Sequence, residues 1–249
     1  MKKSRKRKRE KSIVVVFLII VLFMWKSKMY DKKPNVEKAE NKVKEVEEGE
    51  PAFEFKEESK REITDWRLVL VNQENALSND FVIELAKIDR IREFDARAVG
   101  ELHQMIEAMK NDGITNVWVQ SAYRTVKHQE ELFEHKIKEY EAQGKTHEEA
   151  ERIALRTINK PGTSEHNLGL AVDFNYVDYS FDETEGFKWL KENAENYGFI
   201  LRYEKEKEEI TKVDYEPWHW RYVGREHAVK IKELGMCLEE YIEYLKIKR

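Results

Sequence analysis

Residues 164–174 read SEHNLGLAVDF, and this stretch anchors the predicted fold. It places Asp173 inside an otherwise apolar run, residues 170–174, that is typical of a short buried strand. A buried carboxylate without a partner is costly, so Asp173 needs a helix end, an arginine or a metal ion beside it. Gly169 allows the chain to turn before the strand, which lets the side chains of His166 and Asp173 converge.

A second segment, residues 216–223, reads EPWHWRYV and supplies another histidine. Glu216 and His219 are three positions apart, which would put them on opposite faces of a straight strand. A turn at Pro217 is therefore required if both side chains are to face one site. In that arrangement we expect His219 and Arg221 to point into a cleft. The other face is expected to carry three aromatic residues: Trp218, Trp220 and Tyr222.

Taken together, the two segments predict a catalytic zinc site. Such a site needs three nitrogen or oxygen ligands from the protein, an open position and a nearby base. His166, Asp173 and His219 supply the ligands, and Glu216 is placed to be the base. Either histidine alone is more often an ordinary structural residue, so the prediction depends on the combination. Zinc is inferred from the ligand types, because nitrogen and oxygen ligands do not select zinc by affinity alone.

Apolar periodicity predicts an α+β domain with a small, mostly antiparallel sheet, helices packed on it and the zinc site in a cleft of the sheet. Strands are expected at residues 67–72, 116–120, 170–174, 199–203 and 218–223. Helices are expected at residues 98–111, 127–143, 147–158 and 185–197, with one or two more at the C-terminus. The strands do not alternate regularly with helices, which argues against a parallel βαβ architecture.

Composition narrows the class of protein further. Of 249 residues, 41% are hydrophobic, enough for a sizeable core and too many for a disordered chain. The net charge of −4 argues against a dedicated nucleic-acid binder. A single cysteine, Cys237, excludes an internal disulfide framework and a cysteine-based zinc cluster.

The N-terminal region has the outline of an export signal. Residues 1–12 carry eight Lys or Arg and one Glu, and thirteen apolar residues follow from Ile13 to Trp25. Small residues of the Ala-x-Ala type do not follow the apolar run, so residues 13–30 are interpreted as an uncleaved transmembrane signal anchor. A cleaved signal peptide is the alternative. The positive-inside rule then predicts a cytoplasmic tail and a single-pass protein of the cell membrane whose domain is extracellular.

Residues 31–62 are expected to be a charged, flexible stalk. They contain eleven acidic and eight basic residues and few large apolar ones, which is too little to offset the entropy of ordering. The folded domain is predicted to occupy residues 63–249.

The motif Ser-x-His-(x)6-Asp, Ser164 to Asp173, followed by Glu-x-x-His, Glu216 to His219, resembles the zinc D-alanyl-D-alanine carboxypeptidase family of the vancomycin-resistance type. That family belongs to a wider group with lysostaphin-like endopeptidases and the hedgehog signalling domain. Other segments that follow its pattern are residues 121–125 with Gln129, residues 161–166 and residues 215–224. The resemblance covers roughly residues 66–235. Departures are Lys212, where relatives usually have glycine, and the charged run 204–209.

The resemblance implies roles for further residues. Zinc would be held by His166, Asp173 and His219, with Glu216 as general base. Arg124 would stabilise the oxyanion or hold the terminal carboxylate of the substrate. Weaker candidates for substrate contacts are Ser164, Gln129, Tyr123 and the wall residue Trp218. A structural salt bridge is the alternative role of Arg124.

The implied substrate is the stem peptide of peptidoglycan, from which the terminal D-alanine would be removed. Other specificities of the same site remain open: an L,D-carboxypeptidase or a D,D-dipeptidase. A zinc-containing binding module without turnover is a third possibility, and Glu216 argues against it. The expected partners are the stem peptide and, through the anchor, the membrane, where the basic tail could also bind anionic lipid. Nucleic acid is not expected to bind, and the domain is expected to be monomeric.

Overall fold

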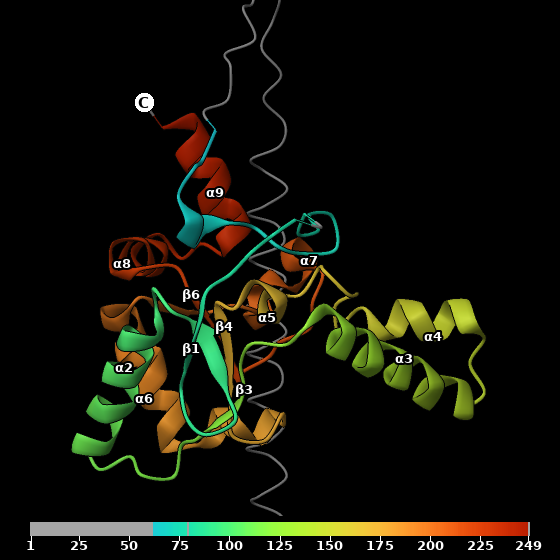
Figure 1. The fold of residues 1–249 in the computed structure, drawn as a ribbon, viewed down its shortest axis with the longest axis horizontal. Coiled ribbons are helices and arrows are strands. Elements are labelled where there is room, and N and C mark those ends of the chain that lie inside the picture. The colour runs from blue at the N-terminus through green and yellow to red at the C-terminus, as the bar shows by residue number, and fades with distance from the viewer. Residues whose placement is uncertain (1–61, 79, 249) are drawn as a thin grey trace, which may run out of the picture. The chain divides into compact units, whose positions relative to one another are not determined.

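The computed structural model describes residues 62–78 and 80–248, and in them the fold is α+β (Figure 1). Its main sheet has the strand order β3-β4-β6-β5, and every neighbouring pair is antiparallel, as predicted. The strands are β3 Val119–Ser121, β4 Ala171–Phe174, β5 Phe199–Leu201 and β6 His219–Tyr222. A separate antiparallel hairpin, β1 Leu85–Lys87 with β2 Glu93–Asp95, was not predicted.

The pairing of β4 with β6 brings the two motifs together. Asp173 lies directly opposite His219 in the register, and Val172 lies opposite Trp220. Directly opposite residues of an antiparallel pair have Cβ atoms about 5 Å apart and share one face of the sheet. All residues of both strands are buried, so the polar pair is enclosed by the domain.

The main core lies between the sheet and two helices, α2 Val99–Asn111 and α6 Glu185–Asn193. Helix α2 buries Leu102, Met105 and Met109 at helical spacing, as predicted. Helix α6 ends earlier than expected and continues as the 3₁₀ helix η3 Ala194–Tyr197, which Gly198 closes with a φ of 87°.

Two C-terminal helices, α8 Arg225–Leu234 and α9 Leu238–Ile247, form a second core with Leu68 and Ile200. The strand predicted at 67–72 is wrong. Asp65 accepts a hydrogen bond from the amide of Arg67 and begins the 3₁₀ helix η1 Trp66–Leu68 instead. This segment does not pair with the sheet. Leu68 and Leu70 instead pack in the core formed with α8 and α9.

Helices α3 Val126–Ala142 and α4 His147–Ala154 form a hairpin that extends away from the sheet (Figure 1). Thr146 and Glu149 make a capping box at the start of α4. Both helices were predicted, although α4 ends earlier than expected. Residues of α3 border the site described below.

The remaining elements are short and were not predicted. They are α5 Glu165–Leu168, α7 Glu208–Thr211, η2 Tyr179–Glu183 and η4 Lys205–Lys207. The predicted tail, anchor and stalk fall on residues 1–62, of which 1–61 lie outside the described residues. No helix within the described ranges is long and apolar enough to cross a membrane.

Candidate metal centre

The short helix α5 carries His166 to the end of β4. Ser164 Oγ accepts a hydrogen bond from the amide of His166 at 3.3 Å, and Gly169 ends the helix with a φ of 75°. The positive φ favours glycine at this position, and a Cβ atom there would also require the Ile83 side chain to move. The turn expected from Gly169 is therefore confirmed.

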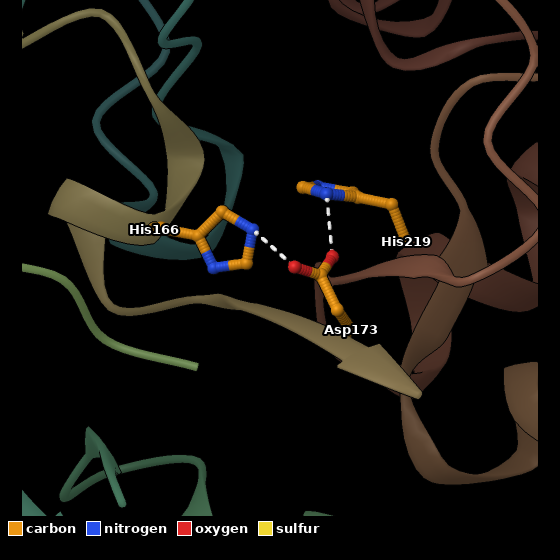
Figure 2. Close-up of side chains that lie close together, drawn as sticks. All are labelled: His166, Asp173 and His219. Carbon is orange, nitrogen blue, oxygen red and sulfur yellow. Dashed lines mark ion pairs between the residues drawn. The ribbon is translucent and has the colours of Figure 1, made fainter. Parts of the chain in front are cut away.

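His166, Asp173 and His219 meet, and their ligand atoms all lie within 4.8 Å of one another. Figure 2 shows Asp173 between the two imidazole rings. His166 Nε2 lies 3.2 Å from Asp173 Oδ2, and His219 Nδ1 lies 3.2 Å from Asp173 Oδ1. All three residues are buried. The predicted convergence of these side chains is confirmed.

The second nitrogen of each ring has its own partner, which leaves one lone pair free to bind a metal. His166 Nδ1 lies 2.7 Å from the carbonyl oxygen of Ala122, so it must carry the proton and donate. His219 Nε2 lies 3.4 Å from Glu165 Oε2 and donates to that carboxylate. Metal-binding histidines are oriented by this kind of outer hydrogen bond.

These residues fit a zinc ion. Asp173 Oδ1 is buried and receives no hydrogen bond from the described residues. Its neighbour His219 Nδ1 also presents a lone pair once the ring is neutral, so the two atoms repel unless a cation lies between them. The donor set of two imidazoles and one carboxylate, with an open side, is that of catalytic zinc sites.

The buried charges around the three ligands shift their pKa values. Burial lowers the pKa of His219, but its contacts with Asp173 and Glu165 outweigh burial and raise the pKa to about 9. Burial and the charge of Arg124 lower the pKa of His166 to about 4. Burial opposes the ionised form of Asp173, yet the neighbouring histidines and Arg124 hold its pKa well below the usual range.

Glu216 lies next to the three ligands. Its Oε2 atom is 3.6 Å from His219 Nδ1, and the residue is buried. The amide of His219 donates to the carbonyl of Glu216 at 3.1 Å, which makes the turn predicted at Pro217. Burial is the main reason that the pKa of Glu216 is raised to about 8, and the charge of Asp173 adds to it. A cation held by the three ligands would favour the ionised form of Glu216, which is the form that can accept a proton.

Arg124 is held in place from three sides. Its Nη2 donates to Asp173 Oδ2 at 2.7 Å, its Nε to Ser121 Oγ at 2.8 Å, and its Nη1 to Gln129 Oε1 at 3.2 Å. Gln129 also donates to the carbonyl of Asn159 at 2.7 Å, so its amide is committed to orienting Arg124. The salt bridge considered for Arg124 therefore exists, and the residue still borders the cleft.

A cleft of about 410 Å³ opens over the three ligands. Residues of α3 and of the segment that follows β4 both line it. The lining includes Arg124, Gln129, Ser164, Val177, Tyr179, Tyr203, Glu216 and Trp218. Trp218 forms a wall, as predicted. Tyr123 is not among the described residues that line the cleft.

The prediction that Arg221 points into the cleft is wrong. Arg221 is fully buried, and its Nη1 lies 2.7 Å from Glu165 Oε1. No role was predicted for Glu165 from the sequence. The available signal was its position: it is a charged residue next to the predicted ligand His166. Its partners come from distant parts of the chain, and no local pattern identifies them.

A buried His/Asp/His donor set with a buried glutamate beside it, on a small antiparallel sheet, defines a zinc metallopeptidase. A family profile described as "VanY: D-alanyl-D-alanine carboxypeptidase" matches residues 92–225. The chain belongs to this VanY family, as the motif resemblance indicated. The profile's description gives D-alanyl-D-alanine carboxypeptidase as the activity of the family, and a structure of one VanY protein contains Zn(II).

Known relatives agree with this assignment. A D-alanyl-D-alanine carboxypeptidase of Enterococcus faecalis is 42% identical over 178 residues, which cover 72% of this chain and 66% of that protein, just under two thirds. Crystal structures of a VanY D,D-pentapeptidase with Zn(II) and of VanYB with D-alanine-D-alanine match with TM-scores of 0.65 and 0.66. Their identities are 42% and 41%, over 71% and 74% of this chain and 99% of each of theirs. The LD-carboxypeptidase LdcB is 32% identical, with a TM-score of 0.61 over 75% of this chain and 90% of its own.

Proposed function

We propose that this protein removes the terminal D-alanine from peptidoglycan stem peptides that end in D-alanyl-D-alanine. The observation that carries the proposal is the convergence of His166, Asp173 and His219 beside the buried Glu216. The VanY structures with zinc and with D-alanine-D-alanine support the same cofactor and the same ligand for this chain.

In this proposal each side chain has a defined task. His166 Nε2, His219 Nδ1 and a carboxylate oxygen of Asp173 hold zinc, which supplies a Lewis acid and makes water acidic enough to attack at neutral pH. Glu216 accepts the proton of the attacking water and passes it to the leaving amine of D-alanine. Arg124, held rigidly at the cleft, places its guanidinium against the developing oxyanion or the terminal carboxylate.

The alternative specificities also have support among solved structures. Besides LdcB, a D,D-dipeptidase of the VanXYg type is 28% identical, with a TM-score of 0.61 over 72% of this chain. The choice depends on how the cleft holds the rest of the stem peptide, and its lining beyond the ligands includes Lys136, Tyr140, Val177 and Tyr179. The binding-module alternative lacks such support, because a module without turnover has no need for Glu216.

Product analysis on three defined substrates tests the proposal. A stem pentapeptide, the corresponding tetrapeptide and free D-alanyl-D-alanine are incubated separately with the full-length zinc-loaded protein. We expect free D-alanine from the pentapeptide and little from the other two. Release from the tetrapeptide would instead establish an L,D-carboxypeptidase, and cleavage of the free dipeptide would establish a dipeptidase.

We also propose that residues 13–30 anchor the protein in the cell membrane with the domain outside, joined by the stalk 31–62. The basic and apolar N-terminal segments and the extracellular position of peptidoglycan support this arrangement. Intact cells treated with protease should lose the domain while residues 1–12 stay protected. A domain protected until the cells are lysed would contradict it.

A further inference from the structure

The carboxylate of Glu165 is completely buried directly behind the metal centre. Its Oε2 atom lies 3.4 Å from Nε2 of His219, on the side of the ring away from Asp173. Its Oε1 atom accepts hydrogen bonds from Arg202 Nε and Arg221 Nη1, both at 2.7 Å. One oxygen of Glu165 is thus fixed by two arginines, and the other is directed at the histidine.

The two arginines are themselves held by distant parts of the chain. Arg202 follows β5 and binds Glu239 of α9 with both terminal nitrogens, at 2.9 and 2.6 Å. Arg221 lies in β6 and donates through Nη2 to the carbonyl oxygens of Arg67 and Val69, at 2.9 Å each. Neither guanidinium group is exposed to solvent.

Burying so many charges costs folding energy, because the desolvation penalty can exceed the attraction between the ions. A well-packed apolar cluster at the same place would stabilise the fold at least as well. Because both arginines donate to Oε1, Oε2 is the oxygen left to accept a hydrogen bond from Nε2 of His219. The arrangement is thus better suited to orienting the histidine than to stabilising the fold.

We propose that Glu165 is a positioning residue that fixes the proton of His219 on Nε2 and aims Nδ1 at the metal. The inference rests on the metal site of the proposed function. His166 receives the equivalent support from a backbone carbonyl, so the two rings are held in opposite tautomers by two different acceptors. Arg202 and Arg221 hold Glu165 directly through Oε1, whereas Glu239 and the carbonyls of Arg67 and Val69 contact only the arginines and are one step further from His219.

Glu165→Gln tests the proposal, because glutamine keeps the size of the side chain and removes its charge. Loss of an outer partner of a metal-binding histidine typically weakens metal binding by about 10–100-fold. We therefore expect the zinc affinity of the full-length variant, measured by chelator competition, to fall by that factor. Thermal unfolding of the metal-free protein, measured in parallel, separates this effect from a general loss of stability.

Glu239→Gln is the matched control. It removes another carboxylate of the same network, one that contacts Arg202 but not His219. We expect it to lower the melting temperature and to leave zinc affinity within about threefold of wild type. Equal zinc affinity in wild type and Glu165→Gln, or an equal loss in both variants, would overturn the proposal.

A second measurement uses the wild-type protein and applies even if the variants do not fold. In the zinc-loaded state, ¹⁵N chemical shifts should show His219 protonated at Nε2 and His166 protonated at Nδ1. Protonation of His219 at Nδ1 would overturn the proposal together with the assignment of Nδ1 as a zinc ligand, whereas the comparison of Glu165→Gln with Glu239→Gln tests the positioning role alone. A wild-type protein that binds no zinc would overturn the proposed function as well.

Discussion

At the scale of single residues, Asp173 shows how one side chain can be predicted from its surroundings. A carboxylate in an apolar strand needs a partner, and the structure gives it two histidines and Arg124. The sequence alone could not decide between an arginine and a metal ion, and the structure places Arg124 against Asp173 within a donor set that also fits a metal ion. The three ligands and Glu216 were predicted because their side-chain chemistry and local spacing suffice to identify them.

Glu216→Gln should retain zinc and lose turnover. The amide keeps the shape of the side chain but cannot accept the proton of the attacking water. We expect zinc content equal to wild type and a fall in kcat of about 10²–10⁴-fold. Metal analysis and D-alanine release from a pentapeptide measure the two quantities. A variant that keeps full activity would remove Glu216 from the role of general base.

Arg124→Lys should impair catalysis although the charge is conserved. A lysine ammonium cannot reach Ser121, Gln129 and Asp173 simultaneously, so the charge is no longer fixed at the cleft. We expect a fall in kcat/KM of about tenfold or more, equivalent to about 1.4 kcal/mol of transition-state stabilisation. Steady-state kinetics with equal values for both proteins would show that only the charge matters.

Cys237 should react slowly with alkylating agents in the folded protein. Burial raises the pKa of its thiol to about 11. At pH 8 about one thiol in a thousand is then ionised, whereas a free cysteine with a pKa of about 8.5 is ionised to roughly a quarter. Iodoacetamide labelling at pH 8 should be slow in native protein, accelerate as the pH approaches 11, and be fast in urea. Equal rates in native and unfolded protein would contradict this.

At the scale of elements, long periodic helices were predicted well and short ones were not. Helices α2 and α3 have clear apolar faces, and Gly113 and Gly144 follow them with φ values of 85° and 87°. Helix α5 is too short to show a period. The strand predicted at 67–72 failed because Leu68 and Leu70 pack with α8 and α9 while Val71 joins the main core, and alternation does not reveal such tertiary contacts.

The end of α7 carries a small amount of backbone strain. Lys212 has a φ of 62°, in the left-handed region that favours glycine over residues with a Cβ atom. Lys212→Gly should therefore stabilise the protein by about 1 kcal/mol, as measured by chemical denaturation.

Gly235 provides the matched control for this prediction. It has the same φ of 62° at the end of α8, and a Cβ atom there would meet nothing within 4 Å. Gly235→Ala should destabilise by about 1 kcal/mol for purely conformational reasons. If Lys212→Gly is also destabilising, the backbone at Lys212 is not strained as described.

At the scale of the whole molecule, the site depends on contacts that join the middle of the sequence to both ends of the domain. The pairing of β4 with β6 could be anticipated from the two motifs, since their ligands must meet. The support of His219 by Glu165, Arg202 and Arg221 could not, because these buried charges come from separate elements. The candidate metal ligands could thus be predicted from the sequence, whereas the residues that orient His219 are evident only in the three-dimensional structure.

Dependence of activity on the metal tests the central claim most directly. Full-length protein is stripped of metal with a chelator, assayed for D-alanine release from a stem pentapeptide, and assayed again after addition of one equivalent of zinc. We predict that the stripped protein is inactive and that zinc restores its activity. Unchanged release of D-alanine by protein that contains no metal would contradict the account.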